Sequence, residues 1–408
     1  MLTPRHMQLF RKTTRPIIYT LLFLFGFLMP TQFGKHFFLP FSYLSGIRID
    51  YLAPTVYAID LLIVILAVYH RAHLRKTLQN VYLQLFLFLV SITLWFSYSR
   101  EVALYQYVRL LEMIVIFSVV RSERRNGWLL QLGLMCSMAL ELILSAMQVV
   151  TKSSVNGPFY YLGERMFSLS TIGIAKASMS GVELMRAYGT FSHPNSLGGF
   201  YLLLYTFVLF SSQRSWTRTL TLAVAPLLIF LSFSKVAILG FALITLKYFV
   251  VQNIFTKERC LVCIGAKLLS LLIPVAIILR VVGDPLSAAI RMQLMNNAML
   301  LIQTHLSAGV GLGNYIIAQQ FFPTLSIGSF GQPVHNIFLL LLAEVGIIPL
   351  LLFLWVAVPF LRQNRKNYQL IACVFIVCFT GLFDHYWITL IQNSALVATV
   401  FGLLESEE

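Results

Sequence analysis

Two arginines, Arg186 and Arg291, lie in the longer polar stretches of an otherwise apolar chain. A guanidinium group donates paired, charge-assisted hydrogen bonds to phosphate oxygens, so two such residues together could hold a diphosphate. Each arginine also has a simpler interpretation. Arg186 could be a solvated or snorkelling loop residue, and Arg291 could lie on the polar face of a helix at the membrane surface.

Two short polar motifs, His193-Pro194-Asn195 and His335-Asn336, each open a long apolar helix. A helix N-terminus offers free N–H groups and the positive end of the helix dipole, which favours a phosphate or a developing anion. His335 could act as a general base or donate a hydrogen bond to an acceptor. Helix capping without any catalytic role is the alternative for both motifs.

Acidic residues are rare in the apolar segments. Asp384-His385 lies at the outer end of the last two apolar stretches and could orient an acceptor hydroxyl. Glu344 lies two and a half helical turns after His335, which indicates a structural hydrogen-bonding role. Other acids are predicted inside helices, where they either make interhelical contacts or mark an ion pathway: Asp60, Glu112 and Glu141.

The composition identifies the class of protein that must position these residues. The 408 residues are 58% hydrophobic and only 11% charged, whereas soluble domains carry about 25% charged residues. Continuously apolar runs of about 17–25 residues match the thickness of a bilayer core and do not alternate as barrel strands do. The chain is therefore predicted to be an all-α polytopic membrane protein with about twelve spans, near 17–33, 51–69, 78–97, 102–120, 127–150, 195–212, 217–231, 235–252, 261–280, 335–357, 367–382 and 387–403.

The net charge of +15 does not indicate a nucleic-acid partner, because the basic residues form short clusters between the predicted spans. Short loops rich in Lys and Arg mark the cytoplasmic side of a membrane. With twelve spans and a cytoplasmic amino terminus, the carboxyl terminus and every basic cluster fall on that side: Arg5–Arg15, His70–Lys76, Arg121–Arg125, Arg214–Arg218, Lys257–Arg259 and Arg362–Lys366.

The predicted organisation is one membrane domain, 1–408, with two long outer loops at about 151–194 and 281–334. All other connections are predicted to be short. Long loops in compact domains are usually functional or disordered, and neither of these is of low complexity. Ser287–His305 has apolar residues at helical spacing, which predicts an amphipathic helix on the outer face.

Taken together, the motifs resemble the O-antigen ligase and O-antigen polymerase superfamily of bacterial membrane proteins. The matching segments are Arg186 with GTFSHPNSLGG (189–199), Arg291 followed by THLSAGVGLGNY (304–315), HNIFLLLLAEVGI (335–347), and Asp384-His385. Their order and the large outer loop before His335 also match. The specific motifs cover about 180–347 and the region of 384, and the four in order are more specific than any one alone.

The resemblance implies a metal-independent, inverting glycosyl transfer at the outer face of the bacterial cytoplasmic membrane, without a cofactor. The donor would be a glycan on undecaprenyl diphosphate, and the acceptor either lipid A–core or another lipid-linked glycan. By the same resemblance, the diphosphate-binding arginines correspond to Arg186 and Arg291, the essential histidine to His335, and a late aspartate to Asp384. The matched segments add further expected substrate-binding residues: His193, Asn195, Asn314, Asn336 and His385.

Other functions remain open at this stage. A transporter or a flippase of lipid-linked glycans would need a site near the membrane midplane or a cationic central cavity, and usually internal repeats. The sequence has no visible repeat, and its polar motifs are predicted at the outer rim. No acidic pair of the kind that binds Mg²⁺ occurs in the outer loops. The sequence does not distinguish a ligase from a polymerase, because both use the same donor chemistry.

Overall fold

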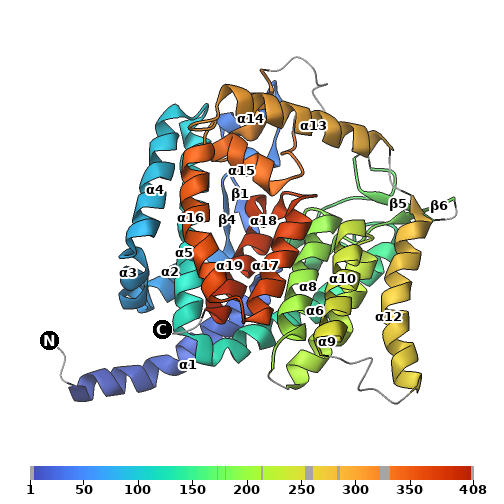
Figure 1. Ribbon diagram of the computed structural model, residues 1–408, viewed down its shortest axis with the longest axis horizontal. Helices are drawn as coiled ribbons and strands as arrows, with labels where there is room; N and C mark the ends of the chain where they lie inside the picture. Colours follow the sequence, from blue (N-terminus) through green and yellow to red (C-terminus); the bar gives the residue numbers. More distant parts are fainter. Residues whose placement is uncertain are drawn as a thin grey trace.

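The computed structural model describes residues 4–405, apart from 172, 180, 213–214, 253–260, 283–284 and 322–330. Long helices run side by side through most of the molecule (Figure 1). Their bounds follow the predicted apolar segments closely, because continuous apolar sequence specifies both the helix and its burial. The long helices are α1 (Pro4–Leu28), α2 (Ala58–Tyr69), α3 (Arg71–Leu78), α4 (Val81–Thr93), α5 (Arg100–Ser122), α6 (Gly127–Thr151), α8 (Pro194–Leu209), α9 (Trp216–Leu231), α10 (Lys235–Val251), α12 (Leu261–Arg280), α13 (Pro285–Thr304), α15 (Ile337–Val345), α16 (Ile347–Gln363), α17 (Tyr368–Gly381) and α19 (Ile391–Leu404).

Length and composition identify two membrane-spanning helices among the described residues, Arg100–Ser122 and Arg124–Thr151. The number rises to four if each of two bent pairs counts as one span. These pairs are α3 with α4, bent by 79°, and α15 with α16, bent by 120°. Five shorter apolar helices accompany them. The total of twelve spans remains a prediction, and its basic cluster Lys257–Arg259, like Arg214, lies outside the described residues.

Helix α8 forms the centre of the molecule and packs against α9, α10, α17 and α19. Its residues from Ser196 to Leu209 are all buried. A helix that is apolar all round can only be stable when other helices cover every face. Gly199 permits one close contact, since a Cβ atom at this position would lie 2.2 Å from the Tyr386 hydroxyl.

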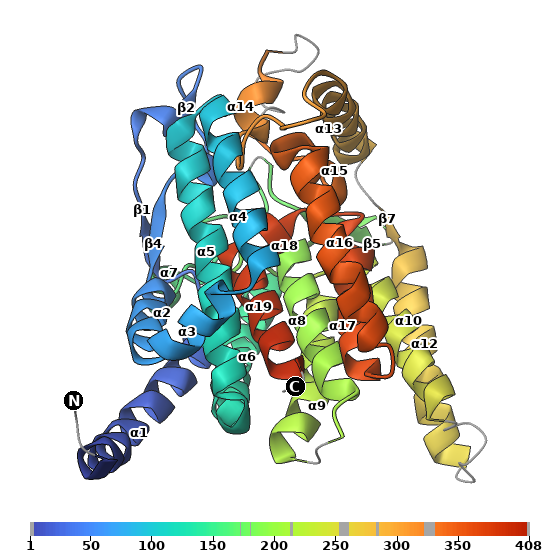
Figure 2. The same cartoon turned by 60° about the vertical axis from the view of Figure 1, so that its left-hand side comes forward.

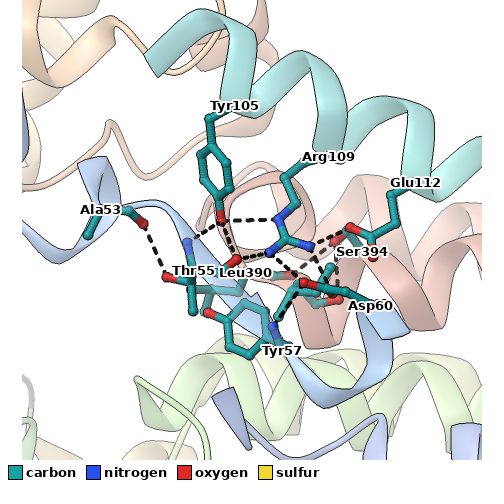
Figure 3. A network of polar contacts seen from close by, with 10 residues as sticks. Ala53, Thr55, Tyr57, Asp60, Tyr105, Arg109, Glu112, Leu390 and Ser394 are labelled. Carbon is teal, nitrogen blue, oxygen red and sulfur yellow. Dashed lines mark hydrogen bonds and ion pairs between the residues drawn. The ribbon is translucent and has the colours of Figure 1, made fainter. Parts of the chain in front are cut away.

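A buried ionic network joins α2 to α5 (Figure 3). Arg109 Nη1 donates to Asp60 Oδ1 at 2.9 Å and to Glu112, while its Nη2 donates to Asp60 Oδ2 at 3.1 Å. The Arg109 Nε donates to the Tyr105 hydroxyl at 3.0 Å. Asp60 therefore makes the predicted interhelical contact, whereas Glu112 bonds the same arginine from within α5.

The predicted span 335–357 is broken at Gly346, which separates α15 from α16. The last carbonyls of α15 have no partner within the helix. The glycine-rich turn Gly309–Gly313 supplies donors in their place: the Val310 N–H bonds the Ala343 carbonyl at 2.9 Å, and the Gly311 N–H bonds the Glu344 carbonyl at 2.8 Å. The prediction did not include this break, at which an outer-loop backbone segment replaces the helical hydrogen bonds.

The prediction that all connections besides the two outer loops are short is also wrong. Met29–Tyr57, between α1 and α2, contains two small antiparallel pairs and two single-turn 3₁₀ helices. Its apolar residues suggested helical spans, but several of them pair as strands instead. Its elements are β1 (Gly34–His36) with β4 (Thr55–Tyr57), β2 (Tyr43–Leu44) with β3 (Ile47–Arg48), and the 3₁₀ turns Pro40–Ser42 and Asp50–Leu52.

The outer loops contain the expected short helices and also strands. The predicted helix over 287–305 is confirmed as α13, and α14 (Tyr315–Gln319) follows it; α7 (Pro158–Tyr161) lies in the first loop. The two loops are joined by a small sheet of β5 (Lys176–Met179), β6 (Val182–Met185) and β7 (Val281–Val282). In Figure 2, α13 and α14 lie at one end of the helices and both chain termini lie toward the other end.

Candidate active site

Arg186 follows β6 and begins a turn that is held by polar residues of α6. The Gln148 Oε1 accepts hydrogen bonds from the backbone N–H groups of Tyr188 at 3.0 Å and Gly189 at 2.9 Å. Glu141 accepts from the Thr190 N–H at 3.1 Å and from its hydroxyl. Glu141 thus bonds the turn and not a second helix, which differs from the predicted interhelical contact, and it fixes the backbone that follows Arg186.

A chain of hydrogen bonds links Arg186 to the carboxyl-terminal part of the protein. Its Nε donates to the Ser232 carbonyl at 2.9 Å, and its Nη2 donates to Asn195 Oδ1 at 2.5 Å. The Asn195 Nδ2 in turn donates to Asp384 Oδ2 at 2.7 Å. These contacts bring together three predicted site residues that the sequence separates by up to 198 positions, from 186 to 384.

His335 and His385 lie beside this chain. Their ring centroids are 5.1 Å apart at an interplanar angle of 74°. The His385 N–H donates to Asp384 Oδ1 at 2.8 Å, and its Nδ1 contacts the Thr389 hydroxyl at 2.7 Å in the short helix α18 (Tyr386–Thr389). The Nδ1 of His335 is buried and has no hydrogen-bond partner among the described residues. This nitrogen is therefore not engaged in a hydrogen bond with another described residue.

The helix-capping interpretation holds for one histidine and not for the other. The His193 Nδ1 accepts from the Asn195 N–H at 3.1 Å and caps α8. At α15 the cap is Asn336, whose Oδ1 accepts from Phe338 N at 2.9 Å and Leu339 N at 3.0 Å. His335 precedes this cap and does not make it. Asn336 also donates to the Leu382 carbonyl at 3.2 Å, which ties α15 to the segment before Asp384.

Arg291 approaches the same cluster from α13. Burial is the largest cause of the lowered pKa values of His193, His335, His385 and Arg186, and the positive charge of Arg291 lowers them further. No carboxylate within the described residues pairs with Arg291, and its Nε is buried without a hydrogen-bond partner there. The site therefore has a second arginine whose charge is not neutralised by a direct ion pair.

Burial sets the protonation states of the cluster. It lowers the pKa of His335 and lowers that of His385 to about 3, so both rings are neutral near neutral pH. Burial also lowers the pKa of Arg186 to about 10, which leaves that residue charged. For Asp384, burial alone would raise the pKa, but the positive charge of the surrounding histidines, where they are protonated, and the Asn195 hydrogen bond lower it overall.

One trio in the cluster has the geometry of a metal site. Ligand atoms of His335, Asp384 and His385 all lie within 4.8 Å of one another in the described structure. The surrounding charges fit a cation poorly, however. Both Asp384 oxygens already accept hydrogen bonds, and Arg186 and Arg291 add two positive charges nearby. This electrostatic field favours an anion over a divalent cation.

Asn314 was predicted to bind substrate, but its contacts are structural. Its side chain is fully buried, accepts from the Ser99 N–H at 2.6 Å, and donates to the carbonyls of Ser99 at 3.1 Å and Leu312 at 2.9 Å. Glu344 accepts from the Tyr315 N–H at 3.4 Å, in line with its predicted structural role. Both residues shape the glycine-rich turn between α13 and α14.

Two residues near the cluster were not predicted. The Tyr51 ring, from the connection between α1 and α2, meets the His385 ring edge-on at 5.6 Å. Arg165, in the first outer loop, donates to the Ser192 carbonyl at 2.9 Å, directly before His193. Nothing in the sequence around Tyr51 distinguishes it from an interfacial aromatic. Arg165 could have been noticed as an isolated basic residue in a predicted functional loop.

Comparison with known proteins tests the family resemblance that the sequence motifs indicated. Residues 196–354 match a family model described as O-antigen ligase. The match confirms the predicted resemblance for this part of the chain, and it supports glycan transfer of the O-antigen ligase or polymerase type in general terms. It includes Arg291 and His335, whereas Arg186 and Asp384 lie outside the matched range. No curated protein matches the chain.

Proposed function

We propose that this protein transfers a glycan from undecaprenyl diphosphate to a glycan acceptor at the outer face of the cytoplasmic membrane. The acceptor is either lipid A–core, which makes the enzyme a ligase, or a second lipid-linked glycan, which makes it a polymerase. The reaction inverts the anomeric carbon and needs neither metal nor cofactor. Arg186 and Arg291 bind the donor diphosphate, and His335 serves the acceptor.

One observation carries this proposal: two arginines without a carboxylate partner among the described residues lie around a partly buried histidine, whose Nδ1 has no hydrogen-bond partner among those residues. Arginines in a protein interior are normally paired, because an unpaired buried charge is costly. An anionic ligand would provide the missing partner. A diphosphate group fits because it offers several oxygens to planar guanidinium donors.

The chemistry follows from this placement. The acceptor hydroxyl oxygen forms a bond to the anomeric carbon while the bond from that carbon to the diphosphate oxygen breaks. His335 accepts the hydroxyl proton at its free Nδ1, and Asp384 stabilises the imidazolium that results. Arg186 and Arg291 stabilise the negative charge that develops on the leaving diphosphate. Because the hydroxyl attacks opposite the leaving group, the configuration inverts.

The orientation in the membrane is part of the proposal. Both termini lie toward the end of the molecule opposite α13 and α14 (Figure 2). Basic clusters such as His70–Lys76 and Arg362–Lys366 occur in short connections, which favours the cytoplasmic side for these connections. The site near α13 and the start of α15 would then face the periplasm, where lipid-linked glycans serve as donors.

The test uses purified protein in lipid nanodiscs with EDTA, incubated with undecaprenyl-diphosphate-linked glycan with and without lipid A–core. Transfer to lipid A–core identifies a ligase, and elongation of the lipid-linked glycan without it identifies a polymerase. Arg291→Ala and His335→Ala are expected to abolish either product. Movement of intact lipid-linked glycan across the bilayer without any transfer would support the flippase alternative and refute the proposal.

A further inference from the structure

The segment that carries Arg165 is held rigidly at the side of the site. The Glu164 carboxylate is only 3% exposed and accepts from the Val155 N–H at 2.7 Å, the Asn156 N–H at 2.6 Å and the Gln148 Nε2 at 2.9 Å. The Gln148 side chain is the same one that holds the turn after Arg186. The first outer loop and the Arg186 turn therefore share one anchor on α6.

Arg165 itself is exposed on this rigid base. Its one hydrogen bond within the described residues is from Nη1 to the Ser192 carbonyl at 2.9 Å. A guanidinium group has five N–H donors in a planar fork, so most of its donors remain free for another ligand. No carboxylate among the described residues neutralises its charge. This is the same unpaired condition that Arg186 and Arg291 show, at a more exposed position.

Tyr51 lies between two charged groups in electrostatic terms and touches the candidate site through His385. The Tyr51 ring packs edge-on against His385. Burial raises the pKa of its hydroxyl, Asp384 raises it further, and Arg165 lowers it, so Asp384 and Arg165 both act on this one group. Arg165 also lowers the pKa of Tyr188, which follows Arg186 by two residues. The hydrogen bond of Arg165 to Ser192, directly before His193, places Arg165 at the border of the site.

We propose that Arg165 is a second anion-binding position of this site, which takes a phosphate group of the acceptor while Arg186 and Arg291 hold the donor diphosphate. The inference rests on the proposed function, because only a transferase needs two substrates in place at once. Both possible acceptors carry phosphate: lipid A–core on its sugars, and a lipid-linked glycan in its diphosphate. Arg165 would fix the acceptor so that its hydroxyl reaches His335.

The experiment measures binding rather than turnover, by native mass spectrometry of nanodisc-embedded protein in EDTA. The variants are Arg165→Ala, Arg165→Lys and, as a control on the same outer surface, Lys176→Ala, whose ammonium pairs with Glu183 at 3.3 Å. The ligands are lipid A–core, the same molecule after dephosphorylation, and undecaprenyl-diphosphate-linked glycan. Melting temperatures of all variants establish that each remains folded.

If lipid A–core is the acceptor, Arg165→Ala weakens its binding about five- to tenfold, as expected for one exposed charge-assisted contact. Arg165→Lys weakens it less, Lys176→Ala leaves it unchanged, and dephosphorylation removes the difference between wild type and Arg165→Ala. If the acceptor is lipid-linked, the wild type binds two copies of the lipid-linked glycan and Arg165→Ala binds one. Either result supports the proposal and names the source of the phosphate.

Equal binding of all ligands by wild type and Arg165→Ala overturns the proposal, as does a wild type that binds neither acceptor. Because binding requires no reaction, the outcome is independent of whether transfer occurs. A protein that loses acceptor affinity on Arg165→Ala but transfers no glycan would refute the proposed function and leave the anion-binding role of Arg165 intact.

Discussion

Two regions of this protein bury arginine in opposite ways. Between α2 and α5, Arg109 is enclosed by two carboxylates, Asp60 and Glu112, and by the Tyr105 hydroxyl (Figure 3). In the candidate site, Arg186 bonds only neutral acceptors, the Ser232 carbonyl and Asn195. Arg291 has no acid partner among the described residues. One region has an excess of acid over arginine, and the other an excess of arginine over acid.

The difference indicates what each region is for. A buried arginine with two carboxylates has its charge fully compensated and can only hold helices together. Arg186 and Arg291 have only Asp384 nearby and do not bond it directly. Part of their positive charge and some of their N–H donors therefore remain available to a ligand. The cost of leaving them unpaired is acceptable where an anion repeatedly fills the place. The ionic network is therefore expected to control stability, and the site to control activity.

The largest effect is expected on stability, from removing the arginine of the ionic network between α2 and α5. Arg109→Met leaves Asp60 and Glu112 buried without a cation and should lower the free energy of unfolding by about 3–5 kcal/mol. The measurement is unfolding in detergent or bicelles. Neutralising the acids as well, in Arg109→Met/Asp60→Asn/Glu112→Gln, should recover most of this loss. An Arg109→Met protein as stable as the wild type would contradict the structural role.

Next in size is the effect of removing a site arginine. Arg186→Ala and Arg291→Ala should each lower kcat about 10²- to 10³-fold, since each removes a fixed cation from the developing diphosphate charge. Their unfolding free energies should stay close to that of the wild type, because neither substitution leaves a buried carboxylate without its cation. Loss of folding in these variants, instead of loss of turnover, would erase the distinction between the two regions.

A single substitution can give Arg186 a carboxylate partner, as Arg109 has between α2 and α5. Asn195→Asp places a carboxylate against Arg186, where the asparagine Oδ1 now lies at 2.5 Å. The paired arginine should then bind the donor less well, and KM for the donor should rise about tenfold. Asn195→Ala serves as the matched control, with a smaller rise because it removes the hydrogen bond without adding charge. Equal KM values in the two variants would argue against charge compensation.

The smallest predicted effect is on pH dependence. His335 must be neutral to accept a proton, and burial lowers its pKa below the ordinary value of 6.5. The neutral form therefore predominates from alkaline pH down through 6.5, and kcat/KM should decline only at still lower pH. An exposed histidine would already have lost half its base form at 6.5. A profile that falls with a midpoint near 6.5 would show that His335 is solvated in the working enzyme.

Much of the helical framework could be predicted from the sequence, since continuous apolar segments specify membrane helices with little ambiguity. The starts of α8 and α15 and the helix α13 agree with their predicted positions within a few residues. The break at Gly346 could not be predicted, because its cause is an outer-loop turn far away in the sequence. The strands between α1 and α2 were missed for a related reason: short apolar stretches fit strand or helix equally well.

The site was predicted in its residues but not in its connections. Arg186, His335 and Asp384 were recognisable because polar residues are rare in this chain. That Asn195 bridges Arg186 to Asp384 depends on how α8 and α17 pack, which sequence spacing does not encode. Asn314 shows the opposite case. It lies in a matching motif, yet it is buried against Ser99 and supports the turn.

The most direct test of the account is the affinity of the resting protein for undecaprenyl diphosphate and for undecaprenyl monophosphate, measured in EDTA for the wild type, Arg186→Ala, Arg291→Ala and Arg109→Met. The account predicts that the wild type prefers the diphosphate and that both site variants lose this preference. Arg109→Met should keep it wherever the protein remains folded. Wild-type preference in Arg186→Ala and Arg291→Ala would contradict the claim that unpaired arginines form the donor site.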